Sequence, residues 1–538
     1  MKIIDQTKNT IRKQKGKVTK RNQVPGSSKI TEFRLVTSKV DIEPQPDLID
    51  EVNLDFTSFL HQELESLMQP AENYGFNITN EFPNQDEDNQ NWIDNIMDNI
   101  SKVSPVESES IFEPLDYQNE FRLVNHYCRS MCEFYSVKEP KWNFYSMVSN
   151  HYAYRFTPLR YSLLAWSGLH LSIVEKSTSS LSKTYYKTAL TLIMKENFHN
   201  SSVPIELLLA SAYFLALYDL MEGTGNTVFI LKHVWSTLRV GNIFESELNQ
   251  SNDQKLSAFG YQIITWLIYI DIKSALFIGN INFPDYIFLD DSKNQNLNIQ
   301  YLTVSEVYES KTVSNIYQHS RHVLSDIYGE SYPKKNILTD NTQDKILVLM
   351  VKNMLLLGSL IRLRCWLESC GNSTDFDPQS LETKINMLHQ ESMKLYQYEN
   401  DKEDVTLFHI LIINALIHSS VIYFDRICHP DIRTNDRSQK SADEILKIAL
   451  KLKNLRGIET PGSLQWPLPM FIAGIETTHD IQKDWISHEL DNYEDAGWGS
   501  QIGKMKILLQ NTWKEQDKVN SRVDVGKLMH DITGYFVM

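Results

Sequence analysis

Four long segments with apolar residues all round the helix constrain the fold of this chain most strongly. They are residues 205–222, 259–276, 346–368 and 405–424, and none of them contains proline. A helix that is apolar on every side has to be buried, so other helices must surround it. No run of short alternating strands with tight turns interrupts this pattern. The sequence therefore predicts an all-α fold, a large multi-helix domain built from layers of helical hairpins.

One of these segments is also long enough to cross a bilayer. Residues 405–424 contain no Asp, Glu, Lys or Arg, and their length matches a transmembrane helix. The segment also carries polar groups that are costly in lipid, namely His409, Asn414, His418, Ser419 and Ser420. We interpret it as a buried core helix.

The first 111 residues differ from the rest and are predicted to form a disordered tail. Residues 8–21 concentrate Lys and Arg without an apolar stripe, which indicates a solvated basic arm. Residues 43–110 are acidic, with Lys102 as their one Lys or Arg, and apolar residues alternate with carboxylates at 54–67 and 86–100. Such alternation is typical of activation segments that fold on a partner, or of a linker whose apolar residues dock on the body.

We assign residues 112–538 to one helical domain. The net charge of −15 argues against a broad basic face that coats nucleic acid. Five cysteines in 538 residues are too few for a disulfide framework and indicate a reducing compartment. The first residues lack the apolar core of a secretory signal.

The cysteines and histidines give little support for a metal site or a catalytic site. His126, Cys128 and Cys132 have the spacing H-x-C-x3-C, but zinc usually needs four ligands, so we interpret them as one packed helix face. Cys365 and Cys370 lack CxxC spacing and are expected to be one buried and one surface thiol.

No nucleotide-binding, zinc-protease or hydrolase motif is present either. His418 and His429, on either side of the sequence SSVIYFDRIC, are expected to be structural. We predict a protein that is not an enzyme, with no catalytic residues and no metal ligands, and its cofactor-binding residues are unknown.

A short apolar connector follows the helix predicted at 442–455. Pro467 and Pro469 are expected to hold it extended, and Ala473 and Gly474 are small enough for a close backbone approach. An amphipathic helix then resumes near 479–493. The connector is predicted to be buried, either as a packing motif or as one wall of an apolar ligand cavity.

Two patches of the chain resemble the fungal-specific transcription factor domain, the helical regulatory region of fungal binuclear zinc-cluster regulators. One patch is a Trp-Pro step, an Ala-Gly pair, a Trp-Ile pair and a later Trp. The other is an aromatic-x-Asp helix followed by Gly and Pro within 265–288. The matching residues are Trp466, Pro467, Ala473, Gly474, Trp485, Ile486 and Trp513, and Tyr269, Asp271, Gly279 and Pro284. Lys483 and Asp484 stand where the family often has an Arg.

The zinc cluster of that family has no counterpart in this sequence. The cluster needs six closely spaced thiolates, and no cysteine precedes Cys128. The family's DNA-binding residues therefore transfer to no position here, and no zinc cofactor is expected. The basic arm at 8–21 is either a nuclear import signal, a phosphate-contacting tail or a solubilising tail.

The resemblance implies a nuclear fungal regulator of transcription by RNA polymerase II. It would act through an effector-binding or dimerisation domain, in nitrogen or amino-acid metabolism by analogy with the family. Its expected partners are other regulators or a second copy, and coactivators, with DNA reached through a partner or through a missing N-terminal module. The alternative is a cytosolic helical scaffold or adaptor without DNA contact.

Overall fold

The computed structural model describes most of the chain from residue 117 onward. The described residues are 117–195, 204–240, 256–277, 279, 281–283, 311–369, 378–396, 404–456 and 466–538. The described residues up to 365, together with those from 378 onward, belong to one compact unit. The predicted tail at 1–111 lies outside the described residues, and the domain boundary at 112 stays a prediction.

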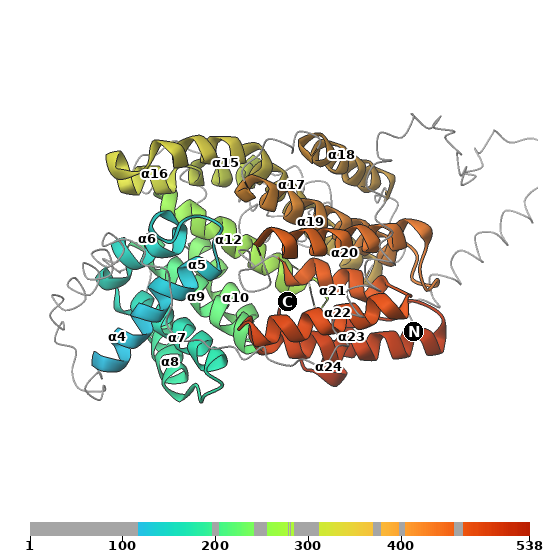
Figure 1. Cartoon of the computed structure of the whole chain (residues 1–538), viewed down its shortest axis with the longest axis horizontal. Coiled ribbons are helices and arrows are strands. Elements are labelled where there is room, and N and C mark those ends of the chain that lie inside the picture. Colours follow the sequence, from blue (N-terminus) through green and yellow to red (C-terminus); the bar gives the residue numbers. More distant parts are fainter. Residues whose placement is uncertain are drawn as a thin grey trace, which may run out of the picture. The chain divides into compact units, whose positions relative to one another are not determined.

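The all-α prediction is confirmed, because every regular element among the described residues is a helix (Figure 1). The N-terminal helix group consists of α4 (Tyr117–His126), the π-helical turn η1 (Tyr127–Met131), α5 (Cys132–Phe134), η2 (Pro140–Trp142), α6 (Phe144–His151), η3 (Ala153–Arg155), α7 (Thr157–Val174), α8 (Ser180–Lys195), α9 (Ile205–Glu222), α10 (Thr227–Val240) and α12 (Ala258–Ala275).

Further helices follow these in the chain. They are α15 (Lys311–Ser320), α16 (Val323–Tyr328), η5 (Gly329–Ser331), α17 (Lys334–Ser369) and α18 (Pro378–Tyr396). The C-terminal helix group consists of α19 (Asp404–Cys428), α20 (Asp436–Arg456), α21 (Pro467–Glu476), α22 (Asp480–Asp495), α23 (Ser500–Val519) and α24 (Val525–Ile532).

Helices α7, α9 and α12 form the interior of the N-terminal helix group. Helix α9 packs against α7, α8, α10 and α12, and all residues from Leu207 to Met221 are buried. The side chain of Ser257 caps the start of α12, and α9 ends at Gly223 in the left-handed conformation, with φ of 68°. The prediction that these apolar segments are interior helices is confirmed.

Aromatic side chains fill the space between α7 and the elements around it. The Trp166 ring lies 4.7 Å from Tyr135, 5.7 Å from Phe214 and 6.3 Å from Tyr127, measured between ring centroids. These spacings are those of tilted and edge-to-face aromatic pairs in protein cores. The N-terminal helix group is therefore held together mainly by apolar and aromatic packing.

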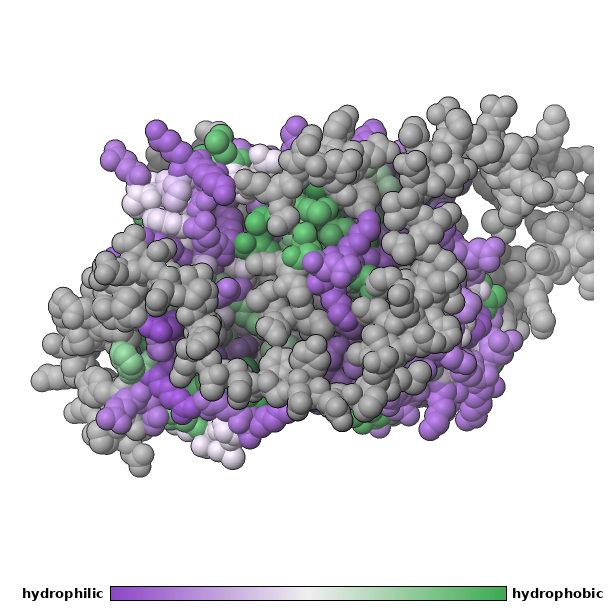
Figure 2. Space-filling model, viewed as in Figure 1, coloured by the Kyte–Doolittle hydropathy of each residue, from purple (hydrophilic) through white to green (hydrophobic). Residues whose placement is uncertain are grey.

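Helices α17 and α19 each contain an apolar stretch long enough to span a membrane. In each, 78% of that stretch is buried inside the structure, as in the core helix of a globular protein. This burial supports the interpretation of residues 405–424 as a core helix. On the face shown in Figure 2, hydrophilic residues cover much of the described surface, and hydrophobic ones gather near α17 and α19.

The connector after α20 is buried, as predicted, but the expectation that it is extended was wrong. Residues 467–476 form α21, in which every residue is buried. Pro467 and Pro469 lie in the first turn, where the backbone N–H groups have no partner within the helix. Proline lacks that N–H and its fixed φ suits a helix start, so both prolines begin the helix.

Trp498 joins the N-terminal and C-terminal helix groups. Its buried ring lies 5.8 Å from Phe134 and 6.0 Å from Tyr493. It stands between Gly497 and Gly499, whose φ values of 91° and 115° are strained for other residues. A Cβ atom on Gly499 would lie 2.4 Å from the carbonyl oxygen of Met221 at the end of α9. Only glycine permits this close approach.

Candidate functional site

The tryptophans of the C-terminal patch tie α21 to the helices that follow it. Trp513 Nε1 donates a hydrogen bond of 2.7 Å to the Gly474 carbonyl oxygen. Trp466 Nε1 donates one of the same length to the Tyr493 hydroxyl. A Cβ atom on Gly474 would lie 2.9 Å from Leu509 Cδ2, so the predicted close backbone approach at this glycine is confirmed.

The rest of this patch is packed into the core. Ala473, Trp485 and Ile486 have side chains that are at most 1% exposed. Together with the contacts of Trp466, Trp513 and Gly474, this burial accounts for the patch as a packing motif, one of the two readings open from the sequence.

The upstream patch closes the C-terminal end of α12. The Asp271 carboxylate accepts hydrogen bonds from the backbone N–H of Asn282 (2.8 Å) and Phe283 (2.7 Å). Arg364, on α17, donates to the carbonyl oxygens of Leu276 and Gly279 at 2.5 and 2.8 Å. Arg364 thus satisfies carbonyl groups at and just beyond the end of α12, where a helix leaves carbonyls open, and Asp271 satisfies two amide groups of the segment that follows.

Tyr269 and Pro284 are the other two residues of that patch. The Tyr269 side chain is buried in α12, and burial raises its pKa above the ordinary value. Pro284 lies outside the described residues.

A buried cluster of charges lies where α19, α21 and the segment after α23 meet. The Glu476 carboxylate accepts a hydrogen bond of 3.0 Å from Arg426 Nη1 and one of 2.5 Å from Arg522 Nη2. The side chains of Glu476 and Arg522 are 0% and 2% exposed. Burial is the main cause of the lowered pKa of Arg426, and the Glu476 carboxylate opposes that shift.

Neighbouring groups complete the hydrogen bonding of this cluster. Arg522 Nη1 donates to the Asp425 and His429 carbonyl oxygens at 2.7 and 3.0 Å. Arg522 Nη2 also donates to the Ser438 hydroxyl, which in turn donates to the Asp425 carboxylate, both at 2.9 Å. The cluster thus joins α19, α20, α21 and the segment between α23 and α24.

Sequence reasoning missed this cluster. Its members are far apart in the chain, and each is a common residue type with no motif around it. One weak signal was available, because Glu476 ends a segment that is otherwise wholly apolar. Buried ion pairs of this kind fix geometry more than they add net stability, and removing one partner is strongly destabilising.

The H-x-C-x3-C residues belong to the core of the N-terminal helix group. Cys128 and Cys132 are buried, and burial raises the pKa of Cys128 to about 12, which makes it a poor nucleophile. His126 Nε2 lies 2.8 Å from His170 Nδ1, and burial lowers their pKa values to about 4 and about 3. Both imidazoles are therefore neutral near pH 7. Within the described residues, no three His, Cys, Asp or Glu side chains are grouped to hold a metal ion.

Of the other cysteines and histidines singled out in the sequence, the described ones lie at packing contacts. Cys365 is partly exposed, and Cys370 lies outside the described residues. The His418 ring lies 5.0 Å from His389, and burial lowers the pKa of His418 to about 3. His429 accepts a hydrogen bond from Arg522 through its backbone carbonyl. His418 thus lies where α19 meets α18, and His429, directly after α19, meets the segment between α23 and α24.

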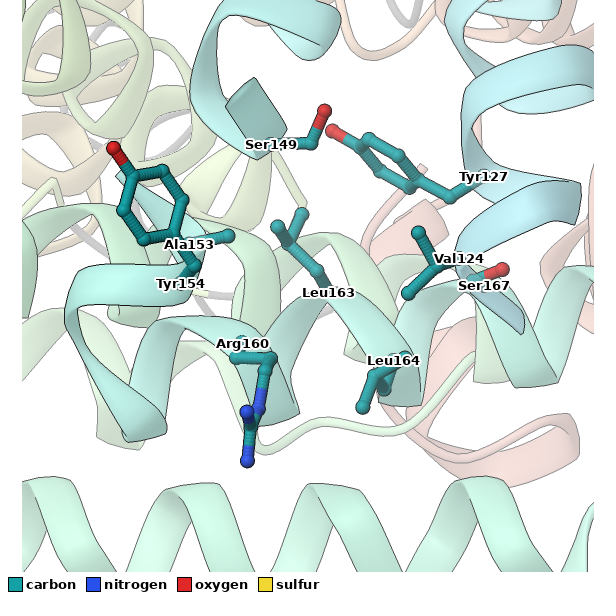
Figure 3. Close-up of a pocket in the computed structure, with 9 residues that line it drawn as sticks. All are labelled: Val124, Tyr127, Ser149, Ala153, Tyr154, Arg160, Leu163, Leu164 and Ser167. Carbon is teal, nitrogen blue, oxygen red and sulfur yellow. The ribbon is translucent and has the colours of Figure 1, made fainter. Parts of the chain in front are cut away.

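A small cavity lies between α4, η3 and α7 (Figure 3). Its volume of about 30 Å³ is room for one or two water molecules and not for a metabolite. In Figure 3 the Arg160 guanidinium points away from the other lining side chains, so the walls are mostly apolar. None of the residues of α21 lines it. The lining residues are Val124, Tyr127, Ser149, Ala153, Tyr154, Arg160, Leu163, Leu164 and Ser167.

Comparison with known proteins places the chain in a family. The fungal specific transcription factor domain matches residues 122–533, which is more than half of the chain. No curated protein and no solved structure matches this chain. The family match spans both helix groups, the tryptophan contacts and the buried charge cluster. The chain therefore belongs to the fungal specific transcription factor domain family.

Proposed function

We propose that this protein is a nuclear regulator of RNA polymerase II transcription whose helical domain works by binding other proteins. The family match over residues 122–533 carries this proposal. The chemistry of the interior supports it, because the two thiols of the H-x-C-x3-C face are buried, and the half-buried His126 and its neighbour His170 are neutral near pH 7. The cavity beside α7 is also too small for a metabolite.

We assign DNA contact to a module other than the helical domain. No cysteine precedes Cys128 in the sequence, so the chain supplies no zinc-cluster ligands there. A partner regulator, a second copy bound to such a regulator, or an additional N-terminal module would bring the chain to promoters. The expected target genes belong to nitrogen or amino-acid metabolism, by analogy with the family.

The acidic segment at 43–110 is proposed to recruit coactivators. Its apolar residues are spaced among carboxylates, the composition of segments that fold on a partner surface. Phe56, Phe59 and Leu60 are three of the apolar residues in the segment at 54–67. Their side chains would supply the apolar contact, while the surrounding acids keep the segment soluble.

A tethering experiment tests this function. The full chain is fused to an unrelated DNA-binding domain, and a reporter gene with the matching site is measured. We expect reporter expression to change, and the triple variant F56A/F59A/L60A to lose most of that change. The matched polar variant N53A/T57A/S58A should keep it. A reporter that does not respond to the full chain contradicts the proposal.

Localisation and promoter binding give a second, independent test. A tagged copy should be nuclear and should crosslink to promoters in cells grown on different nitrogen sources. Permanent cytosolic residence without promoter crosslinking would favour the scaffold function instead. Affinity purification then separates the two functions, because chromatin and coactivator proteins indicate a regulator and cytosolic enzymes indicate a scaffold.

A further inference from the structure

Two mostly buried cations face a loosely held carboxylate beside the start of α22. Arg433 lies in the segment between α19 and α20, and Lys483 lies in the first turn of α22. Each side chain is only 11% exposed. Asp517, in the last turn of α23, faces both, with its carboxylate 3.7 Å from Arg433 Nε and 3.5 Å from Lys483 Nζ.

Those distances are long for buried cations. A charge-assisted hydrogen bond normally spans about 2.7–2.9 Å. Elsewhere in this protein Arg437 meets Glu382 at 2.6 Å, and Lys506 meets Asp491 at 2.5 Å. Asp517 is 57% exposed, so water solvates its carboxylate and weakens its pairing with either cation. Asp517 therefore compensates the two cations only weakly.

The guanidinium of Arg433 is only partly hydrogen-bonded. Its Nη2 donates to the Thr477 carbonyl oxygen at 3.3 Å. Its Nε, which faces Asp517 at 3.7 Å, and its Nη1 are buried, and neither makes a hydrogen bond of normal length in the described part of the chain. Burial lowers the pKa of Arg433, which reflects the cost of keeping this charge away from water. An anion that reached these donors would relieve that cost.

The start of α22 adds to the positive field at this place. The helix has 16 residues, and His479 at its N-cap makes no side-chain hydrogen bond to the first turn. The first backbone bond of the helix runs from Lys483 N to the His479 carbonyl oxygen, so the N–H groups before Lys483 lack intrahelical partners. An uncapped helix start of this length attracts anions.

Asp480 is the second acidic residue at this place. Its carboxylate lies 3.3 Å from Lys483 Nζ, but it is 91% exposed. A carboxylate so exposed rotates into water at little cost, since exposed ion pairs contribute little to stability. Neither Asp480 nor Asp517 therefore neutralises the two cations firmly.

We propose that Arg433, Lys483 and the start of α22 form a binding site for a small dianionic oxyanion, a phosphate group or a dicarboxylate. Asp517 occupies the site in the unliganded protein and swings into solvent when the ligand binds. A dianion carries twice the charge of the Asp517 carboxylate and presents several oxygens, which suits the fork of an arginine together with a lysine. The site does not depend on the proposed transcriptional function. Its ligand binding can be measured on the purified chain alone.

Titration calorimetry of the full chain with inorganic phosphate at constant ionic strength tests this site. We expect saturable binding, lost in R433Q and in K483Q. D517N removes the internal competitor and should tighten binding about fivefold, the equivalent of about 1 kcal/mol. K453Q is the matched control, because Lys453 pairs with Glu489 at 3.0 Å outside the site, and it should bind as the natural protein does.

Parallel titrations with sulfate and with succinate separate the two ligand chemistries. Tighter binding of phosphate and sulfate assigns the site to phosphate groups, and tighter binding of succinate assigns it to dicarboxylates. Circular dichroism checks that each variant is folded. D517N changes an exposed side chain, so it keeps the test decisive if R433Q or K483Q fails to fold. Absence of binding in both the natural protein and D517N overturns the proposal, and so does equal binding in R433Q.

Discussion

The two helix groups of this protein bury polar chemistry in different ways. In the N-terminal helix group, α7, α9 and α12 are apolar on nearly every side, and aromatic rings such as Trp166 fill the spaces between them. The C-terminal helix group buries Arg426, Glu476 and Arg522 in one cluster. Apolar packing is non-directional, whereas a cluster of buried ion pairs requires one specific arrangement of its donors and acceptors. The first group should therefore tolerate substitution and the second should not.

Asp219 and Glu476 are buried carboxylates, one from each helix group, and the two have different partners. Asp219 of α9 accepts hydrogen bonds from the Tyr186 hydroxyl at 3.1 Å and the Thr224 hydroxyl at 2.7 Å. Its partners are neutral, and burial raises its pKa to about 6. Glu476 is held by two guanidinium groups instead. One carboxylate thus lacks cations and favours its proton, while the other balances two positive charges.

Removing Glu476 should have the largest effect. Glu476→Ala leaves the Arg426 and Arg522 guanidinium groups buried without their counterion, so we expect a loss of about 4 kcal/mol in the free energy of unfolding. Urea denaturation of the full chain measures it. Replacing the whole cluster, as R426M/E476L/R522M, should restore much of that loss, because no charge then remains buried. If Glu476→Ala is as stable as the natural protein, the cluster does not stabilise the packing of these helices.

The pH dependence of stability should reveal Asp219. Its pKa of about 6 in the folded protein lies above the ordinary value of 3.8, so between pH 4 and pH 6 the folded state binds more protons than the unfolded state. Raising the pH through this window should therefore lower the free energy of unfolding, by about 3 kcal/mol in total.

Asp219→Asn is the control for that measurement. The variant has no proton to lose, so the difference in unfolding free energy between it and the natural protein should change by that amount between pH 4 and pH 6 and stay constant above. Urea denaturation across the pH series measures the difference. A constant difference throughout would mean that Asp219 is ionised in the folded protein.

Loss of the Trp513 indole N–H should have a smaller effect. Trp513→Phe keeps an aromatic ring but leaves the Gly474 carbonyl oxygen, the acceptor of the 2.7 Å bond, without its donor. An unsatisfied buried acceptor and the lost ring volume together should lower the free energy of unfolding by about 2 kcal/mol. Trp266→Phe on the more exposed side of α12 serves as the comparison and should lose less than half as much.

An apolar exchange in the N-terminal helix group should have the smallest effect. Leu217→Met in α9 keeps the side-chain volume, and the neighbouring side chains are apolar and adaptable, so we expect a loss of about 1 kcal/mol or less. Chemical denaturation measures this change alongside Glu476→Ala. A loss as large as that of Glu476→Ala would remove the distinction between the two groups.

The sequence predicted the helices better than it predicted the contacts between them. The segments at 205–222 and 259–276 were identified as interior helices from their composition, and α9 and α12 match them closely. The two prolines at 467 and 469 predict an extended segment, and this prediction is wrong because both lie in the first turn of α21. Proline disrupts the interior of a helix but is favoured in its first turn. Which effect applies depends on where the helix begins, and the flanking chain sets that point.

The all-helical fold and the choice of interior segments follow from the amino-acid sequence alone, because helical periodicity is a property of residues close together in the chain. The sequence also carries the tryptophan, glycine and aspartate patches that identify the family. Tertiary packing alone brings Arg426, Glu476 and Arg522 together. It also places Asp517 opposite Arg433 and Lys483. Those encounters depend on how helices distant in the chain pack together, and no local pattern encodes that geometry.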